Sequence, residues 1–444
     1  MRNGREILTG VLEATVKSDS SAISDEPRAR RRARILAAAV VCGIAGTANH
    51  AAAALVDNKT LTLDASIAAK EMFDSNIMLQ SRGPDANKGG AITAITPAVG
   101  LTLKNPLSLS GNLRFDYAAT IYRFHTLEEE SHTDHQFGVK FSGTNDRWSY
   151  ESSFSALMVV GEHESYRYFS ADGIPALGTP GIRDRRSQLL LRANDKLQYT
   201  ADSWFARPVL NFYSVDFHIM QSTKSHYVNY VDRSDMNGGV DLGIKLPQNL
   251  WGVVGYRFGY QDQGTVLTSH VYAANTYQRV LIGAEGSPFS WLKFNVLAGP
   301  DFRDFTNDAP AALQTDPRLY VEGSATATFS KDDELAMTAK RWILPSSCGK
   351  TVYADSNYEL TYRHNFTSNL IGRVGMRVCG GEWEMPTHRF DWAYMPKATL
   401  EYKFNKHLST EIGYEFDAAR SADRTLAGRD YDRSLAWIGA KYEF

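Results

Sequence analysis

Apolar side chains recur at every second position in stretch after stretch of the chain. Clear examples are Val240, Leu242, Ile244 and Leu246; Leu370, Val374, Met376 and Val378; and Leu400, Tyr402 and Phe404. The positions between them are polar, as Glu401 and Lys403 show. A period of two predicts β-strands with one apolar and one polar face. The pattern therefore indicates an all-β protein.

The alternation predicts 18 strands. They cover residues 59–72, 90–103, 109–123, 134–142, 148–160, 187–199, 204–218, 238–246, 250–260, 277–285, 291–303, 317–329, 334–344, 356–363, 369–380, 390–404, 408–417 and 431–444. Roughly 390 residues at ~20–22 per strand and connection give the same number. Because the pattern is weakest over 161–237, 16 strands is the alternative.

Connection lengths identify the kind of sheet. Short turns are predicted at 247–249, 286–290, 330–333, 365–368 and 405–407, and longer links at 261–276, 304–316, 345–355, 381–389 and 418–430. Short and long connections thus alternate strictly. Transmembrane β-barrels have this alternation, whereas a Greek-key sandwich does not require it. The prediction is a single antiparallel up-and-down barrel over residues 55–444.

Composition agrees with a barrel and excludes other classes. No apolar run reaches the ~18–20 residues that a membrane helix requires. The chain has 22 Tyr, 21 Phe and 8 Trp, enough to form aromatic girdles at both membrane surfaces. A formal net charge of −2 gives no indication of a nucleic-acid partner.

The N-terminal region has the layout of an export signal. Arg28–Arg34 is basic, residues 35–46 are apolar, and small residues follow to Ala54. This order predicts a signal peptide cleaved between Ala48 and Ala54, so residues 1–54 are expected to be removed as an extension plus signal.

The C-terminal strand resembles the closing strand of bacterial outer-membrane β-barrels. Gly439, Tyr442 and Phe444 match the assembly signal of that class, a Gly followed by aromatics that end at the terminus. Trp437 departs from it, since a polar residue is more usual there. Residues Phe73–Leu79, Phe-Asp-Ser-Asn-Ile-Met-Leu, also resemble the opening motif of a porin family. The resemblance implies the outer membrane of a Gram-negative-type bacterium, with lipid, lipopolysaccharide and the barrel-assembly machinery as partners.

The polar faces predict the residues that line the lumen. The candidates are Arg114, Asp116, Lys140, Glu151, Asp241, Lys245, Arg257, Arg279, Lys293, Glu322, Glu359, Arg363, Arg373, Arg377, Glu401, Lys403, Glu411, Glu415 and Lys441. Positive and negative charges nearly balance, so no ion preference is predicted. An 18-strand barrel is too wide for side chains to fill, which leaves a water channel unless a loop or plug enters.

Three further groups suggest local roles. The long link 161–186 contains Arg183, Arg185 and Arg186, which form a constriction if the loop folds inward and meet lipopolysaccharide or solvent if it does not. Cys348 and Cys379 both fall near the predicted external ends of strands, with one strand between them, and are disulfide candidates. Residues His125–His135 combine imidazoles and carboxylates, but a solvated acidic loop is favoured over a metal site.

The function predicted is a porin, a passive diffusion channel for small hydrophilic solutes or ions, without a cofactor, a metal or a catalytic site. No nucleophile elbow or phosphate-binding loop occurs. The alternatives are a plugged or structural barrel that encloses a partner or an exported polymer, and a barrel enzyme using rim residues such as His218, His226 and Asp232. Assembly as a homo-trimer is left open.

Overall fold

The computed structural model describes residues 54–83, 86–106, 110–160, 187–218, 231–264, 273–306, 317–346, 352–383, 389–422 and 430–444. It also describes the backbone of two short strands between residues 161 and 186. The predicted signal peptide and its cleavage site fall almost entirely outside these residues. No helix among the described residues is long and apolar enough to cross a membrane.

Nearly all described residues belong to β-strands. The strands are β1 (Ala54–Asp57), β2 (Leu61–Asp74), β3 (Gly90–Lys104), β4 (Gly111–Phe124), β5 (His132–Asn145), β6 (Trp148–Val160), β7 (Arg167–Phe169), β8 (Pro175–Leu177), β9 (Ser187–Thr200), β10 (Trp204–Phe217), β11 (Arg233–Leu246), β12 (Leu250–Gln263), β13 (Asn275–Phe289), β14 (Leu292–Phe305), β15 (Arg318–Thr328), β16 (Asp333–Pro345), β17 (Val352–Asn365), β18 (Leu370–Trp383), β19 (Arg389–Lys403), β20 (Leu408–Ser421) and β21 (Tyr431–Glu443).

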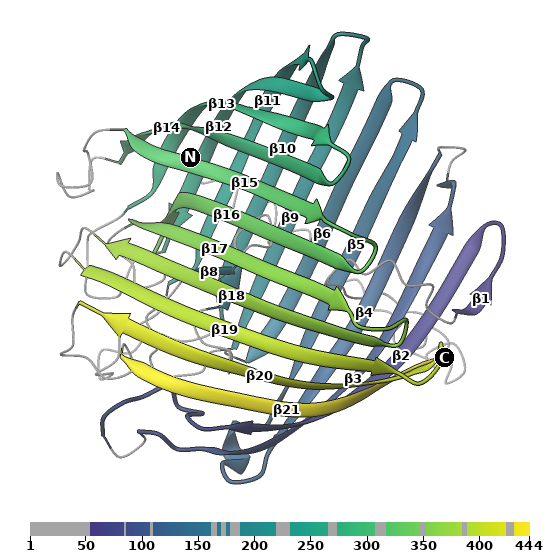
Figure 1. Ribbon diagram of the computed structural model, residues 1–444. Helices are drawn as coiled ribbons and strands as arrows, with labels where there is room; N and C mark the ends of the chain where they lie inside the picture. Colours follow the sequence, from purple (N-terminus) through teal and green to yellow (C-terminus); the bar gives the residue numbers. More distant parts are fainter. Residues whose placement is uncertain are drawn as a thin grey trace, which may run out of the picture. The chain divides into compact units, whose positions relative to one another are not determined.

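Eighteen of these strands close into a barrel (Figure 1). Each strand pairs antiparallel with the next, with β6 passing directly to β9. The last strand β21 pairs with β20 on one side and with the first barrel strand β2 on the other. The predicted closure of residues 431–444 against residues 408–417 and 59–72 is therefore confirmed, as is the count of 18; the alternative of 16 is wrong.

The short strand β1 lies outside the ring of eighteen. It pairs antiparallel with the start of β2, from Ala54 opposite Asp64 to Asp57 opposite Thr62. Lys104 and Thr62 donate hydrogen bonds to the Asp57 carboxylate and lower its pKa from the ordinary value of 3.8. This strand was not predicted, because four residues are too few to show a period.

Strand bounds deviate from the prediction mainly at one end of the barrel. At the end with the short turns, here called the turn end, predicted and observed limits mostly agree within a few residues. At the other, the loop end, strands run further; β12 continues to Gln263 and β17 begins at Val352. The predicted long links 261–276 and 345–355 are correspondingly shorter. The strands extend there because the backbone N–H and C=O groups of neighbouring strands go on forming hydrogen bonds with one another.

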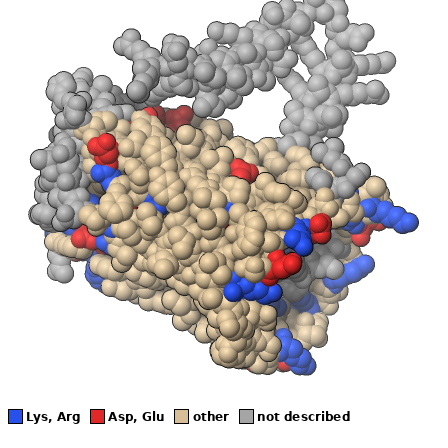
Figure 2. Space-filling view, turned by 90° about the horizontal axis from the view of Figure 1, so that it is seen from above, with Lys and Arg blue, Asp and Glu red and all other residues tan. Residues whose placement is uncertain are grey.

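The barrel wall is apolar on the outside. Along β13, Ile282 is 70% exposed and its neighbour Leu281 is 1% exposed, since successive side chains face opposite sides. Leu242, Ile244, Val254 and Ile438 are likewise among the exposed apolar side chains. Figure 2 shows a largely uncharged outer surface, with many of the charged side chains toward its edges. A closed barrel whose outer surface consists of exposed apolar side chains is typical of a protein surrounded by lipid.

Aromatic residues form a girdle around the turn end. The exposed members are Trp148, Trp204, Phe289, Trp291, Phe329, Phe366, Phe404, Tyr442 and Phe444. Neighbouring rings touch across strands; the centroids of Trp291 and Phe329 lie 5.9 Å apart. Aromatic girdles mark the interface between hydrocarbon and headgroups, so this end of the apolar wall meets a membrane surface.

Asp195 is an exception to the apolar wall. By register it lies opposite Leu210 and Ser152, on the outward face of β9 and well inside the strand. Ser152 Oγ donates a hydrogen bond of 2.5 Å to its carboxylate.

Candidate functional site

Strand register places all the predicted lumen residues on the face opposite the exposed apolar side chains. Arg114 lies across from Lys140, Arg257 from Arg279, and Glu401 from Glu411. Whether these side chains line a conducting pore stays a prediction.

Many charges on the inner face are paired, within a strand or between strands close together in the ring. Arg373 donates to Glu401 at 2.9 Å and Arg377 to Glu359 at 3.1 Å. Arg114 bridges Asp64 and Asp116, at 2.9 and 2.6 Å. The near balance of charge seen in the sequence is thus realised as local ion pairs.

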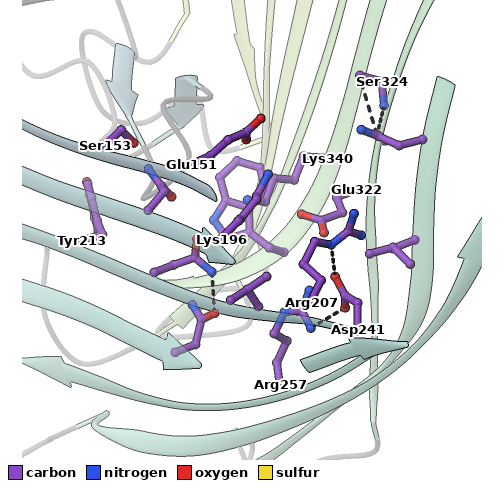
Figure 3. A pocket seen from close by; sticks show the side chains of 18 of the residues that line it. Glu151, Ser153, Lys196, Arg207, Tyr213, Asp241, Arg257, Glu322, Ser324 and Lys340 are labelled. Carbon is purple, nitrogen blue, oxygen red and sulfur yellow. Dashed lines mark hydrogen bonds and ion pairs between the residues drawn. The ribbon is translucent and has the colours of Figure 1, made fainter. Parts of the chain in front are cut away.

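A cavity of about 710 Å³ occupies one side of the lumen (Figure 3). Hydroxyl and amide groups on β6 and β9, such as Ser153 and Asn194, form part of its wall. Charged groups on β10 to β16, such as Arg207, Glu322 and Lys340, form another part. This volume lies within the range of sites that take small molecules, ~300–1,000 Å³.

One network in the cavity wall centres on Asp241 (Figure 3). Arg207 Nε donates to it at 3.1 Å and Arg257 Nη1 lies 2.7 Å from its other oxygen. Arg207 also makes a two-pronged contact with Glu285, both bonds 2.9 Å long. Gly255 leaves room for this carboxylate, because a Cβ there would lie 2.6 Å from Asp241 Oδ1 and would force it to shift. The network joins β10, β11, β12 and β13 into a fixed charged surface.

A second network centres on Arg279. Its Nε donates to Asp301 at 2.7 Å, and its guanidinium lies 4.3 Å from the centre of the Tyr277 ring and 4.2 Å from that of Tyr320. Arg303 donates to the other Asp301 oxygen at 2.8 Å. The faces of the Tyr277 and Tyr320 rings and the shared Asp301 carboxylate stabilise the positive charges of Arg279 and Arg303, which lie close together.

The end of β16 parts from β15 but stays paired with β17 as far as Pro345. Its pairing with β15 ends at Val321 opposite Arg341, and beyond that point its carbonyls accept hydrogen bonds from side chains on β11, β12 and β14. Gln261 and Arg303 donate to the Ile343 carbonyl, at 2.9 and 3.1 Å. Since β12 is four strands away in the ring, these contacts bring the end of the β16–β17 pair toward β11 and β12 on the inner side of the barrel.

We call residues 342–346 the lobe. Two more contacts hold it in place. Arg233 on β11 donates to the Pro345 carbonyl at 2.7 Å, and Gln263 donates to that of Ser346. On its outer side Ile343 packs with Ala273 and Phe305. The lobe lies directly beside the cavity, which Trp342 and Leu344 line. Sequence analysis had assigned 345–355 to an external link and missed Arg233, Gln261 and Arg303.

The long link 161–186 also reaches across the barrel. Its two short strands β7 and β8 pair with each other, and the β8 backbone lies beside β17 and β18. In the ring order these strands stand opposite β6 and β9, from which the link arises. Arg183, Arg185 and Arg186 lie outside the described residues, so their predicted role in a constriction stays a prediction.

Other predicted groups are placed only in part. Cys379 is buried with Asn357 Nδ2 3.1 Å from its sulfur, while Cys348 lies outside the described residues, so the disulfide stays a prediction. Asp232 accepts a hydrogen bond from the Phe217 amide, and His226 lies outside the described residues. Within the described residues, no group of three or more His, Cys, Asp or Glu is arranged to hold a metal ion.

The stretch His125–His135 is split between two faces. His125 contacts Glu71 and Thr93 outside the barrel, and the register places His132 on the inner face. The predicted solvated loop is therefore short, and strand β5 already begins at His132.

An even-numbered antiparallel barrel with an apolar outside, a polar inside and an aromatic girdle is the architecture of the bacterial outer membrane. The chain is an outer-membrane β-barrel of a Gram-negative-type bacterium.

Comparison with solved structures finds similar barrels. OmpT of Vibrio cholerae is 13% identical, with a TM-score of 0.36 over 88% of this chain and 99% of its own. OpdK of Pseudomonas aeruginosa is 10% identical, with a TM-score of 0.39 over 86% and 99%. OccAB4 of Acinetobacter baumannii is 11% identical, with a TM-score of 0.40 over 86% and 98%. No protein-family model and no curated protein matches the chain.

Proposed function

We propose that the protein is a porin through which small hydrophilic solutes or ions diffuse passively and chemically unchanged. The observation that supports this most is the polar cavity inside the closed barrel, where charged side chains from several strands face the lumen. A polar interior is what a water-filled pathway requires, whereas a purely structural barrel has no need of it.

The lobe would set the width of the pathway in this proposal. It is tied to β11, β12 and β14 by side chains, and Arg303 among these is itself fixed by its bond to Asp301. A constriction held by several hydrogen bonds keeps a fixed size, which is how a pore selects solutes. The loop end would face outside the cell, as longer loops do in this class.

Reconstitution into a planar bilayer tests the proposal. Stepwise single-channel conductance is expected from the full chain. A folded barrel that stays silent would contradict it and favour the plugged or structural barrel.

A variant pair tests the lobe. Gln261→Ala with Arg233→Met removes two bonds that tie residues 343–345 to β11 and β12, so single-channel conductance should rise. The matched control is Arg373→Met, which breaks an inner-face ion pair away from the lobe. Equal conductance of the lobe variant and the parent chain would show that the lobe does not limit flow. Deleting residues 161–186 tests the long link by the same measurement.

A further inference from the structure

The barrel closes where its first strand β2 meets its last strand β21. These strands pair from Ser66 opposite Glu443 to Asp74 opposite Leu435. They are the only neighbours in the ring that lie at opposite ends of the described chain, so no turn fixes their register. Something other than loop length must align them.

A buried charge triad spans this seam at the loop end. Arg433 Nε donates to Asp74 on β2 at 3.0 Å, and Arg433 Nη1 donates to Asp417 on β20 at 3.1 Å. The side chains of Arg433 and Asp74 are 0% exposed and that of Asp417 is 3% exposed. Three strands are thus joined by one guanidinium.

The residues after Asp74 continue the seam beyond the paired strands. The Ser75 amide donates to the Ser434 carbonyl at 2.9 Å, and the Ser434 amide donates to Ser75 Oγ at 2.7 Å. Asn76 Nδ2 donates to the Asp432 carbonyl at 3.0 Å. The Asp-Ser-Asn sequence singled out near the start of the chain therefore binds the last strand residue by residue.

Trp437 lies on the turn-end side of the triad, on the inner face and across the same three strands. Its Nε1 donates to Glu411 at 2.8 Å, and Lys70 lies 3.2 Å from the same carboxylate oxygen. A Cβ at Gly413 would lie 2.1 Å from the Trp437 ring, so the indole needs glycine beneath it. This accounts for the tryptophan that departs from the usual terminal pattern.

We propose that Asp74, Ser75 and Asn76 with Arg433 and Asp417 form a seam clasp that selects the register of barrel closure. A slip must be by two residues, since a one-residue slip would turn apolar side chains inward. The outer face opposes a two-residue slip only weakly, because apart from Glu71 its paired members there, such as Ala69, Ile438 and Ala440, are apolar or aromatic. On the inner face the same slip would separate Arg433 from Asp74 while Arg433 stays beside Asp417 on β20. The Asp74 carboxylate would then be buried without its cation, which is strongly unfavourable.

Cysteine cross-linking across the seam tests the proposal in a full chain whose native cysteines are changed to serine. Ala69→Cys with Ala440→Cys reports the observed register, in which these residues are directly opposite. Ala69→Cys with Ile438→Cys reports a slip of two. The seam clasp is removed by Asp74→Asn, Asp417→Asn and Arg433→Met together, which leaves no unpaired charge. Only barrels that stay folded by heat-modifiable gel migration are scored.

With the seam clasp intact, only the first pair should cross-link efficiently. Without it, the slipped pair should cross-link about tenfold more, since losing a buried charge network removes at least one tenfold step in the register equilibrium. The control Arg279→Met, Arg303→Met and Asp301→Asn together removes a similar buried network far from the seam and should leave the slipped cross-link unchanged.

Two outcomes overturn the proposal. One is a folded barrel without the seam clasp that still cross-links only in the observed register; the other is an equal rise in the control. If the triple variant does not fold, Asn76→Ala replaces it. That variant loses the bond to Asp432, and the slipped cross-link should again increase; its absence refutes the seam clasp.

Discussion

A single arginine placed on the outer wall tests whether that wall lies in hydrocarbon. Ile282 is in the middle of β13 and 70% exposed on the outward face. Thr276 is on the same face of the same strand, six residues nearer the loop end. At ~3.3 Å per residue and a tilt of ~40°, the two differ in depth by ~15 Å.

Depth decides the cost of the charge. The apolar band of such barrels is ~25 Å tall, which places Ile282 near its middle and Thr276 near its edge. Ile282→Arg should lower the free energy of unfolding by ~2–4 kcal/mol and Thr276→Arg by ~0–1 kcal/mol. Equilibrium unfolding in urea, followed by tryptophan fluorescence of the barrel in phospholipid vesicles, measures both. Equal costs at the two positions would refute a membrane-embedded wall.

Further predictions concern single side chains. Arg279→Met removes one of the two cations that contact the buried Asp301 carboxylate, and should lower the free energy of unfolding by ~1–3 kcal/mol; no measurable loss would contradict the buried network. Asp195→Leu removes a carboxylate from the lipid-facing wall and should raise that free energy by ~1 kcal/mol; destabilisation would show that the carboxylate contacts something other than lipid. Deleting Phe444 should abolish assembly in cells, scored by outer-membrane fractionation, while refolding in detergent persists; normal assembly would argue against its role as a signal. Hydrogen bonds from Lys104 and Thr62 lower the pKa of Asp57. The bonds that tie β1 to the barrel through Asp57 should therefore be intact above the ordinary carboxyl pKa and weaken as the pH falls through the lowered pKa. A spin label at Leu55 should accordingly become mobile only in acid.

Much of the fold was predictable because a barrel repeats one local rule. The period of two is a property of each strand alone, so it shows in stretches as short as residues 400–404. Short turns were predicted for the same reason, since a hairpin joins strands adjacent in sequence. Inward candidates such as Arg257 and Glu359 followed directly from the alternation.

The missed features depend on contacts between distant residues. Gln261 meets the Ile343 carbonyl because β16 separates from β15 beyond Arg341, and nothing in either segment's sequence indicates that separation. Arg433 reads as one more polar residue in a strand, although it meets a carboxylate 359 positions earlier in the chain. The sequence shows that Arg433 and Asp74 are charged, but it does not show that they form an ion pair.

Strand β1 has a consequence for the connectivity of the chain. The Phe444 amide donates to the Ala65 carbonyl, and Ala54 lies opposite the next residue, Asp64. Because β1 and β21 both run antiparallel to β2, β1 continues the path of β21 in the same direction along the same edge. A short linker from Phe444 to Ala54 would therefore make the described barrel a continuous ring, and new ends could be opened at any turn, for example at residues 405–407. Such a permuted chain would keep every strand pair but would place Phe444 in the interior of the sequence. Its assembly in cells would show whether the barrel needs an aromatic residue at the chain end or only the pairing of β2 with β21.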